Sequence, residues 1–167
     1  MDRTNNEFGR TCVVIPVTFP VLVKPVAKGR PRFGNGRIFT PEKTRKYEAI
    51  VRNEAEKAMA GRPPFDGSVG IRCQFCFNAP KKSSESAGEW RVERPDLDNL
   101  LKAVTDAMNG IVYNDDSQIV MTLATKKRES YDGVFIEVKP LEGRMKNGQK
   151  NNELERENKK SRIQKAF

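Results

Sequence analysis

The chain has 167 residues, which is enough for one domain of ordinary size with its own core and short for two. Its 31 lysines and arginines outnumber 22 aspartates and glutamates, and the net charge of +9 favours polyanionic partners, chiefly nucleic acid or an anionic membrane. The chain contains no histidine, which excludes Ser-His-Asp hydrolysis, Cys-His nucleophiles, HExxH metalloproteases and His-dependent nucleases.

The first half of the chain predicts a strand, a loop and a helix. Residues 12 to 23 are rich in valine but interrupted by two prolines, which is typical of a strand at a sheet edge. The glycines and prolines of residues 24 to 37 indicate a loop. Thr40 as N-cap and Pro41 at the first helical position then begin a helix that we expect over residues 41 to 59.

The second half predicts a strand, a helix and a hairpin. A strand over 68 to 78 alternates Ile71, Cys73, Phe75 and Phe77 on one face, so Cys73 is expected in the strand core. The cysteines are expected to be reduced thiols, and the CxxC is not expected to bind zinc. An amphipathic helix begins at about Asp98 or Asn99 and ends at Asn109-Gly110. Strands over 118 to 126 and 133 to 139 are expected to form an antiparallel hairpin.

This order of elements predicts an α+β fold, a mixed β-sheet with two main helices packed on it. We expect a single domain over 11–140. Residues 141–167 have few apolar side chains and are expected to form a basic, mobile tail. No apolar run long enough for a membrane span and no signal peptide is found, which favours a cytoplasmic protein.

Two groups of aspartates bracket the second helix in the stretch RPDLDNLLKAVTDAMNGIVYNDDSQIV. Asp96 and Asp98 point to one side only if the chain is extended between them, and the proline before Asp96 favours that conformation. A short return of the chain after the helix then brings Asp115 or Asp116 beside the helix start. Taken separately, each group is explained more simply by helix capping and turn chemistry.

Close carboxylates repel each other unless they are protonated or neutralised by a cation. Oxygen donors without histidine favour Mg²⁺, or Mn²⁺, over zinc or copper. Lys102 lies four residues after Asp98 on the same helix face. It either stabilises negative charge on a phosphate or forms an ion pair with Asp98 or Asp106, and the residues alone do not decide between these roles.

Two stretches resemble the RusA-type Holliday junction resolvases, a family common in bacteriophages and prophages. The first is KGRPRFGNGRIFTPEKTRKYE. The second joins RPDLDNLLKAVTDAMNG to YNDDSQIV and continues into a strand that carries two lysines. The Asp-Leu-Asp-Asn sequence, the lysine four residues after its second aspartate and Asp-Asp-Ser-Gln form a specific signature. Together the stretches span residues 28 to 127.

The resemblance implies a homodimeric, Mg²⁺-dependent endonuclease that makes paired nicks in four-way DNA junctions during recombination and repair, in a bacterial or phage-infected cell. The catalytic residues that it implies are Asp96, Asp98, Asp116 and Lys102. The implied metal ligands are Asp96, Asp98 and Asp116, with Asp115 ranked lower. DNA binding is expected from the basic residues Lys28, Arg30, Arg32, Arg37, Lys126 and Lys127. The alternatives are a nuclease for other branched DNA and a basic nucleic-acid-binding module that has no metal-dependent nicking activity.

Overall fold

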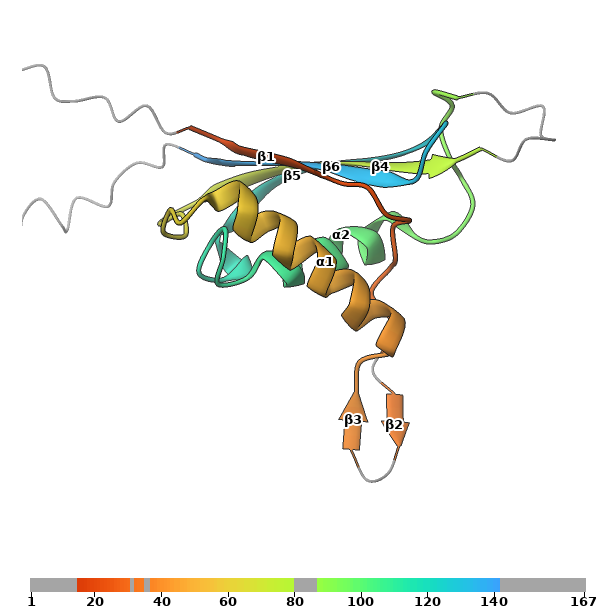
Figure 1. Ribbon diagram of the computed structural model, residues 1–167, viewed down its shortest axis with the longest axis horizontal. Coiled ribbons are helices and arrows are strands. Elements are labelled where there is room, and N and C mark those ends of the chain that lie inside the picture. The colour runs from red at the N-terminus through yellow and green to blue at the C-terminus, as the bar shows by residue number, and fades with distance from the viewer. Residues whose placement is uncertain (1–14, 31, 35–36, 80–86, 142–167) are drawn as a thin grey trace, which may run out of the picture.

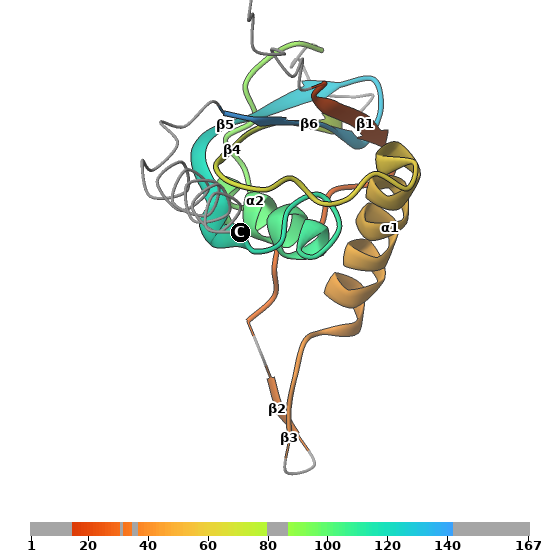
Figure 2. The ribbon, with the colours of Figure 1, turned by 90° about the vertical axis from the view of Figure 1, so that its left-hand side faces the viewer.

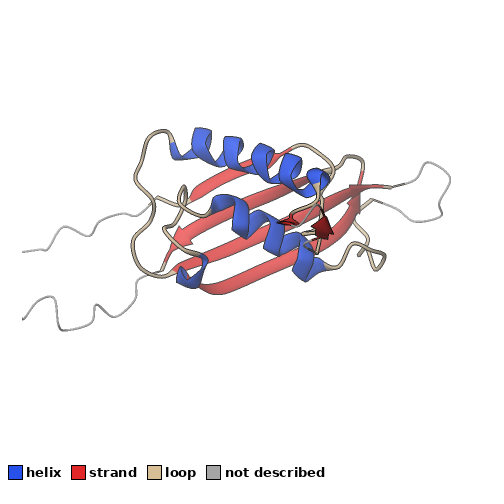
Figure 3. Cartoon of the chain, turned by 90° about the horizontal axis from the view of Figure 1, so that it is seen from below, coloured by secondary structure: helices blue, strands red, loops and turns tan. Residues whose placement is uncertain are grey.

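A computed structural model describes residues 15–30, 32–34, 37–79 and 87–141 of the chain. Its body has two layers, a four-stranded mixed sheet and two helices that lie across one face of that sheet (Figures 1 and 3). The strands of the sheet are β1 (Val17–Val21), β4 (Val69–Asn78), β5 (Ile119–Glu129) and β6 (Gly133–Pro140). The α+β class is therefore confirmed. The expected tail, apart from residue 141, and residues 11 to 14 of the expected domain lie outside the described residues.

The two helices bury the faces that their apolar periodicity predicts. Helix α1 (Glu42–Met59) turns Thr44, Tyr47, Val51, Ala55 and Met59 inward. Helix α2 (Leu97–Met108) buries side chains at the same three- and four-residue spacing. On the sheet, alternate residues of β1, β4 and β6 face the helices, and the buried positions include Phe19, Cys73, Phe75 and Ile136. The core thus lies between the helices and one face of the sheet, as expected.

Two helix starts differ from the sequence expectation by a residue or two. Pro41 is the N-cap of α1, so the helix begins at Glu42 and Thr40 lies outside it. Helix α2 begins at Leu97 with Asp96 as its N-cap, which places Asp98 inside the first turn. Of the two aspartates, only Asp96 has extended backbone, with φ −69° and ψ 143°. The expectation of an extended chain through Asp98 was wrong.

The expected hairpin between β5 and β6 is also wrong. The strand order is β1-β6-β4-β5, so β4 lies between β5 and β6. Strand β4 pairs with β5 in parallel and with β6 in antiparallel orientation. Strand β5 is consequently an edge strand, and Met121 and Leu123 are about half exposed on the face of the sheet that the helices leave open.

Within the segment expected to be a loop, the structure has a short antiparallel hairpin formed by β2 (Arg32–Gly34) and β3 (Arg37–Phe39). This hairpin projects away from the two-layer body in Figures 1 and 2, beyond the N-terminal end of α1. Its strands are three residues each, shorter than the runs that periodicity detects. Among the described residues, no helix is long and apolar enough to span a membrane.

Candidate active site

Asp96 and Asp98 stand at the start of α2, and both are exposed. Asp96 is the N-cap by backbone position, but its carboxylate accepts no capping hydrogen bond. The Asp98 carboxylate accepts one long hydrogen bond, 3.4 Å from Asn99 Nδ2. Neither carboxylate forms an ion pair in the described part of the chain. The capping explanation therefore does not account for the Asp96 side chain.

The backbone that leads into Asp96 is held by the edge strand β5. Residues 88 to 91 run antiparallel to the end of β5, with hydrogen bonds that include Arg91 N to Lys126 O at 3.1 Å. The Lys126 ammonium donates to the carbonyl oxygens of Glu93 and Pro95, both at 2.7 Å. The buried Arg128 forms an ion pair with Glu93. Asp96 thus follows a segment whose path is fixed by a lysine and an arginine of β5.

Lys28 ties the segment before the β2–β3 hairpin to both helices. Its ammonium forms ion pairs with Glu48 of α1 at 2.5 Å and with Asp106 of α2 at 2.8 Å. Burial lowers the pKa of Lys28, but the hydrogen bonds that its ammonium donates to these two carboxylates, with their negative charge, outweigh burial and leave the pKa raised. The Lys28 N–H also donates to Asn99 O at 2.8 Å. The Lys28 ammonium is therefore already paired with carboxylates of the protein itself.

Glycine is needed beside this lysine, because a Cβ at Gly29 would lie 2.8 Å from Cγ of the Pro41 ring. The Gly29 N–H also donates to Thr44 Oγ1 at 3.2 Å. The chain therefore passes directly against the first turn of α1 before it enters the hairpin.

Lys102 forms one of the ion pairs that the sequence left open beside a role at a phosphate. Its ammonium lies 3.3 Å from Asp106 Oδ1, and its side chain is 59% exposed. An exposed pair of this kind contributes about 0.5 kcal/mol or less on a helix. Because this ion pair is weak, it does not prevent the Lys102 ammonium from moving to a phosphate.

Asp115 and Asp116 lie at the short helix η1 (Asp116–Gln118), and their surroundings differ. Asp115 is a capping residue that accepts from Ser117 N at 3.0 Å, and hydrogen bonds from Ser117 hold the pKa of the Asp115 carboxyl below its usual value. The Asp116 side chain is exposed and has no hydrogen bond or ion pair within the described residues. The structural explanation therefore holds for Asp115 and leaves Asp116 unexplained.

The Tyr113 phenol interacts with α2 through a hydrogen bond and with Asp116 through its charge. The buried phenol donates to Thr105 O at 2.7 Å. Burial raises the pKa of this phenol, and the carboxylates of Asp116 and Asp106 add to the rise. Asp116 is thus within electrostatic range of the middle of α2, while Asp96 and Asp98 stand at the beginning of that helix.

The structure does not bring the predicted aspartates together in one cluster. Across the described residues, no group of three or more carboxylate or thiol side chains is placed to hold a metal ion. The donor chemistry nevertheless fits a hard cation, since Asp96 and Asp116 offer exposed oxygens that no other described group occupies. The assignment of Asp96, Asp98 and Asp116 to one metal site remains a prediction.

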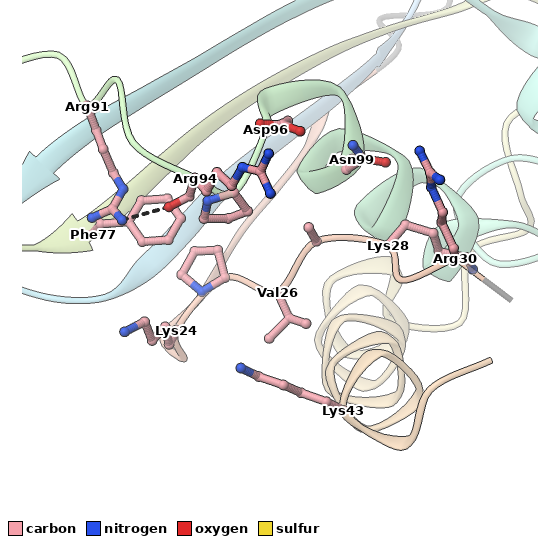
Figure 4. Close-up of a pocket in the computed structure, with 13 residues that line it drawn as sticks. Lys24, Val26, Lys28, Arg30, Lys43, Phe77, Arg91, Arg94, Asp96 and Asn99 are labelled. Atoms are coloured by element: carbon pink, nitrogen blue, oxygen red, sulfur yellow. Dashed lines mark hydrogen bonds between the residues drawn. The ribbon is translucent and has the colours of Figure 1, made fainter. Parts of the chain in front are cut away.

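A basic cleft of about 680 Å³ opens at the start of α2, with Asp96 and Asn99 in its wall (Figure 4). Two of the expected DNA-binding residues, Lys28 and Arg30, also line it. Four further cations were not singled out from the sequence: Lys24, Lys43, Arg91 and Arg94. Lys24, Lys43 and the pair of Arg91 and Arg94 lie too far apart along the chain for a local pattern to group them.

Two other expected DNA-binding residues, Lys126 and Lys127, are not among the residues that line this cleft. Lys126 holds backbone carbonyls, and the Lys127 ammonium lies 4.7 Å from the centre of the Trp90 ring, which is 65% exposed. Arg32 and Arg37 belong to the β2–β3 hairpin, and their side chains lie outside the described residues.

A mixed sheet with two helices on one face, and an unpaired carboxylate in a basic cleft, define a candidate nucleic-acid-processing protein. The model of the family described as endodeoxyribonuclease RusA matches residues 23–139. The chain belongs to this family and is an endodeoxyribonuclease.

Two relatives are similar to the chain in sequence. The chain is 34% identical over 116 residues to the uncharacterised protein YqaN of Bacillus subtilis (strain 168), covering 62% of this chain and 82% of that protein. It is 35% identical over 75 residues to the crossover junction endodeoxyribonuclease rusA of Lactococcus phage r1t, covering 44% of this chain and 57% of that protein.

Proposed function

We propose that the protein is a Mg²⁺-dependent, structure-specific endodeoxyribonuclease that resolves Holliday junctions by paired phosphodiester hydrolysis, in recombination and repair. Family membership and the phage relative support the proposal. The observation that carries it is the placement of the free Asp96 carboxylate in the wall of a cleft whose described lining also includes six lysines and arginines. Branched DNA is the proposed substrate, and two chains act together as a homodimer.

The proposed roles come from the family pattern, and the exposure of these side chains supports them. Asp96 and Asp98 at the helix start, with Asp116, would hold the cation through their carboxylate oxygens. When bound, Mg²⁺ supplies the positive charge that activates water and offsets charge on the phosphate. Lys102 leaves its weak pair with Asp106 and stabilises the phosphate oxygens as the bond to the leaving 3′ oxygen breaks. Asp115 stays the cap of η1 and is a lower-ranked ligand.

The test is the Asp98→Asn variant, because this change keeps the shape of the side chain and removes its charge. Protein and Mg²⁺ are incubated with a four-way junction, a fork and a duplex of matched sequence, and nicks are mapped. We expect paired, symmetric nicks in the junction from the wild type. We expect a loss of at least about a hundredfold in rate from Asp98→Asn, with DNA binding retained.

Asp66→Asn is the matched control, since Asp66 is exposed on the loop before β4 and lies outside the cleft. Its nicking rate should equal that of the wild type. Nicking by Asp98→Asn at the wild-type rate would overturn the assigned site. Equal nicking of fork or duplex would instead replace the junction by another branched or linear substrate.

A further inference from the structure

The cleft at the start of α2 carries more positive charge than the protein neutralises. Lys24, Arg30, Lys43 and Arg94 line it, and in the described part of the chain none of the four forms an ion pair. Among the described residues that line the cleft, Asp96 is the single acidic one. Lys28, by contrast, is already paired with Glu48 and Asp106. Four uncompensated cations in one concavity repel each other, and a polyanion that enters relieves this repulsion.

One wall of the cleft is rigid. The Arg91 guanidinium stacks over the Phe77 ring, 4.4 Å from its centre, and Nη2 donates to Arg94 O at 2.8 Å. The Arg94 and Pro95 backbone is held from the other side by Lys126. Arg94 therefore projects from a fixed stretch of chain, immediately before Asp96 (Figure 4).

The opposite wall comes from two other parts of the chain. Lys24 precedes the segment that packs against α1, and Lys43 lies in the first turn of α1. Figure 4 shows both side chains on the side of the cleft away from Asp96. The cations thus form a path that leads from the start of α1 to the candidate catalytic carboxylate.

We infer that this cleft binds the phosphates of a single DNA strand and leads that strand to Asp96. Arg94 and Arg30 contact phosphates near Asp96, and Lys24 and Lys43 contact phosphates further along the strand. The volume, about 680 Å³, lies in the range of small-ligand pockets and matches a short length of one strand. This inference rests on the proposed function, and it assigns the residues that hold the strand to be cut.

The test removes the two cations furthest from Asp96, in the double variant Lys24→Ala/Lys43→Ala. Binding to the four-way junction is measured in EDTA at several salt concentrations. Each lost contact to a single strand reduces the slope of log K against log salt by about 0.7, so the slope should fall by about 1.4. At 0.1 M salt the affinity should fall roughly tenfold or more. Lys24→Arg/Lys43→Arg should keep both the slope and the affinity.

Lys57→Ala/Lys139→Ala is the matched control, because it removes the same charge from exposed positions outside the cleft. It should leave the slope unchanged. If both double variants weaken binding equally, the cleft has no special role and the inference is overturned.

Nicking of the same junction in Mg²⁺ separates this inference from the proposed function. In one outcome the wild type nicks the junction, and the Lys24→Ala/Lys43→Ala variant binds and nicks it normally. This outcome overturns the inferred role of the cleft and leaves the proposed function unchanged. A wild type that binds through Lys24 and Lys43 but never nicks supports the cleft and overturns the proposed function.

Discussion

The ammonium of Lys126 ties down the backbone immediately before Asp96. In a Lys126→Met variant the carbonyls of Glu93 and Pro95 lose their charged donor, and we expect the free energy of unfolding to fall by about 1–2 kcal/mol. Nicking should slow because Asp96 is held less firmly. The salt slope of DNA binding should stay unchanged. Chemical denaturation, nicking rates and binding at several salt concentrations measure the three quantities.

The neighbouring lysine is the control for this prediction. Lys127 lies on the exposed face of Trp90, and a cation–π contact at such a site contributes about 0.5–1 kcal/mol. Lys127→Met should therefore cost less stability than Lys126→Met. A Lys126→Met protein of wild-type stability, with a salt slope reduced by about 0.9, would show that Lys126 contacts a duplex phosphate instead.

Local patterns predict the residues whose neighbours are close in sequence. Alternation along β4 placed Cys73 and Phe75 in the core, because a strand turns every second side chain the same way. Turn chemistry explained Asp115, which caps η1 through a residue two positions later. Three cations of the cleft, Lys24, Lys43 and Arg94, escaped prediction because they come together only through tertiary packing.

At the scale of elements, the β2–β3 hairpin should act in DNA binding without supporting the fold. Within the described residues its strands pair only with each other, and it projects from the body (Figure 2). Arg32→Ala/Arg37→Ala should therefore change the free energy of unfolding by less than about 0.5 kcal/mol. It should also reduce the salt slope of junction binding by between about 1.4 and 1.8.

Thermal unfolding and salt titrations measure the two effects. Lys57→Ala/Lys139→Ala again controls for net charge, since neither lysine lies on the hairpin. A hairpin variant whose slope matches that of this control would show that the hairpin makes no phosphate contacts.

Element pairing was the least predictable part of the fold. The turn before Gly133 indicated a β5–β6 hairpin, since adjacent strands joined by a short turn usually pair. Strand β4 occupies that position instead and pairs with both strands. Its burial along nearly its whole length, with Cys76 buried as well as Phe75 and Phe77, is the signal of a central strand that alternation alone does not reveal.

At the scale of the whole molecule, each chain carries one cleft with Asp96 in its wall among the described residues, and paired cleavage needs two strands to be cut. A two-fold symmetric homodimer presents two such clefts in equivalent positions. Light scattering should accordingly give twice the mass of the 167-residue chain. A mass of one chain, before and after addition of a junction, would contradict the dimer.

Mixed dimers test whether each chain cuts its own strand. Wild-type and Asp98→Asn chains with different tags are coexpressed, and the heterodimer is purified through both tags. On a supercoiled plasmid that extrudes a cruciform, two coordinated cuts give a linear product, whereas one cut gives an open circle. We expect linear product from the wild type and open circles from the heterodimer, because one of its two sites lacks the Asp98 charge. Linear product at the wild-type rate from the heterodimer would mean that one active chain cuts both strands, and the two-site arrangement would be wrong.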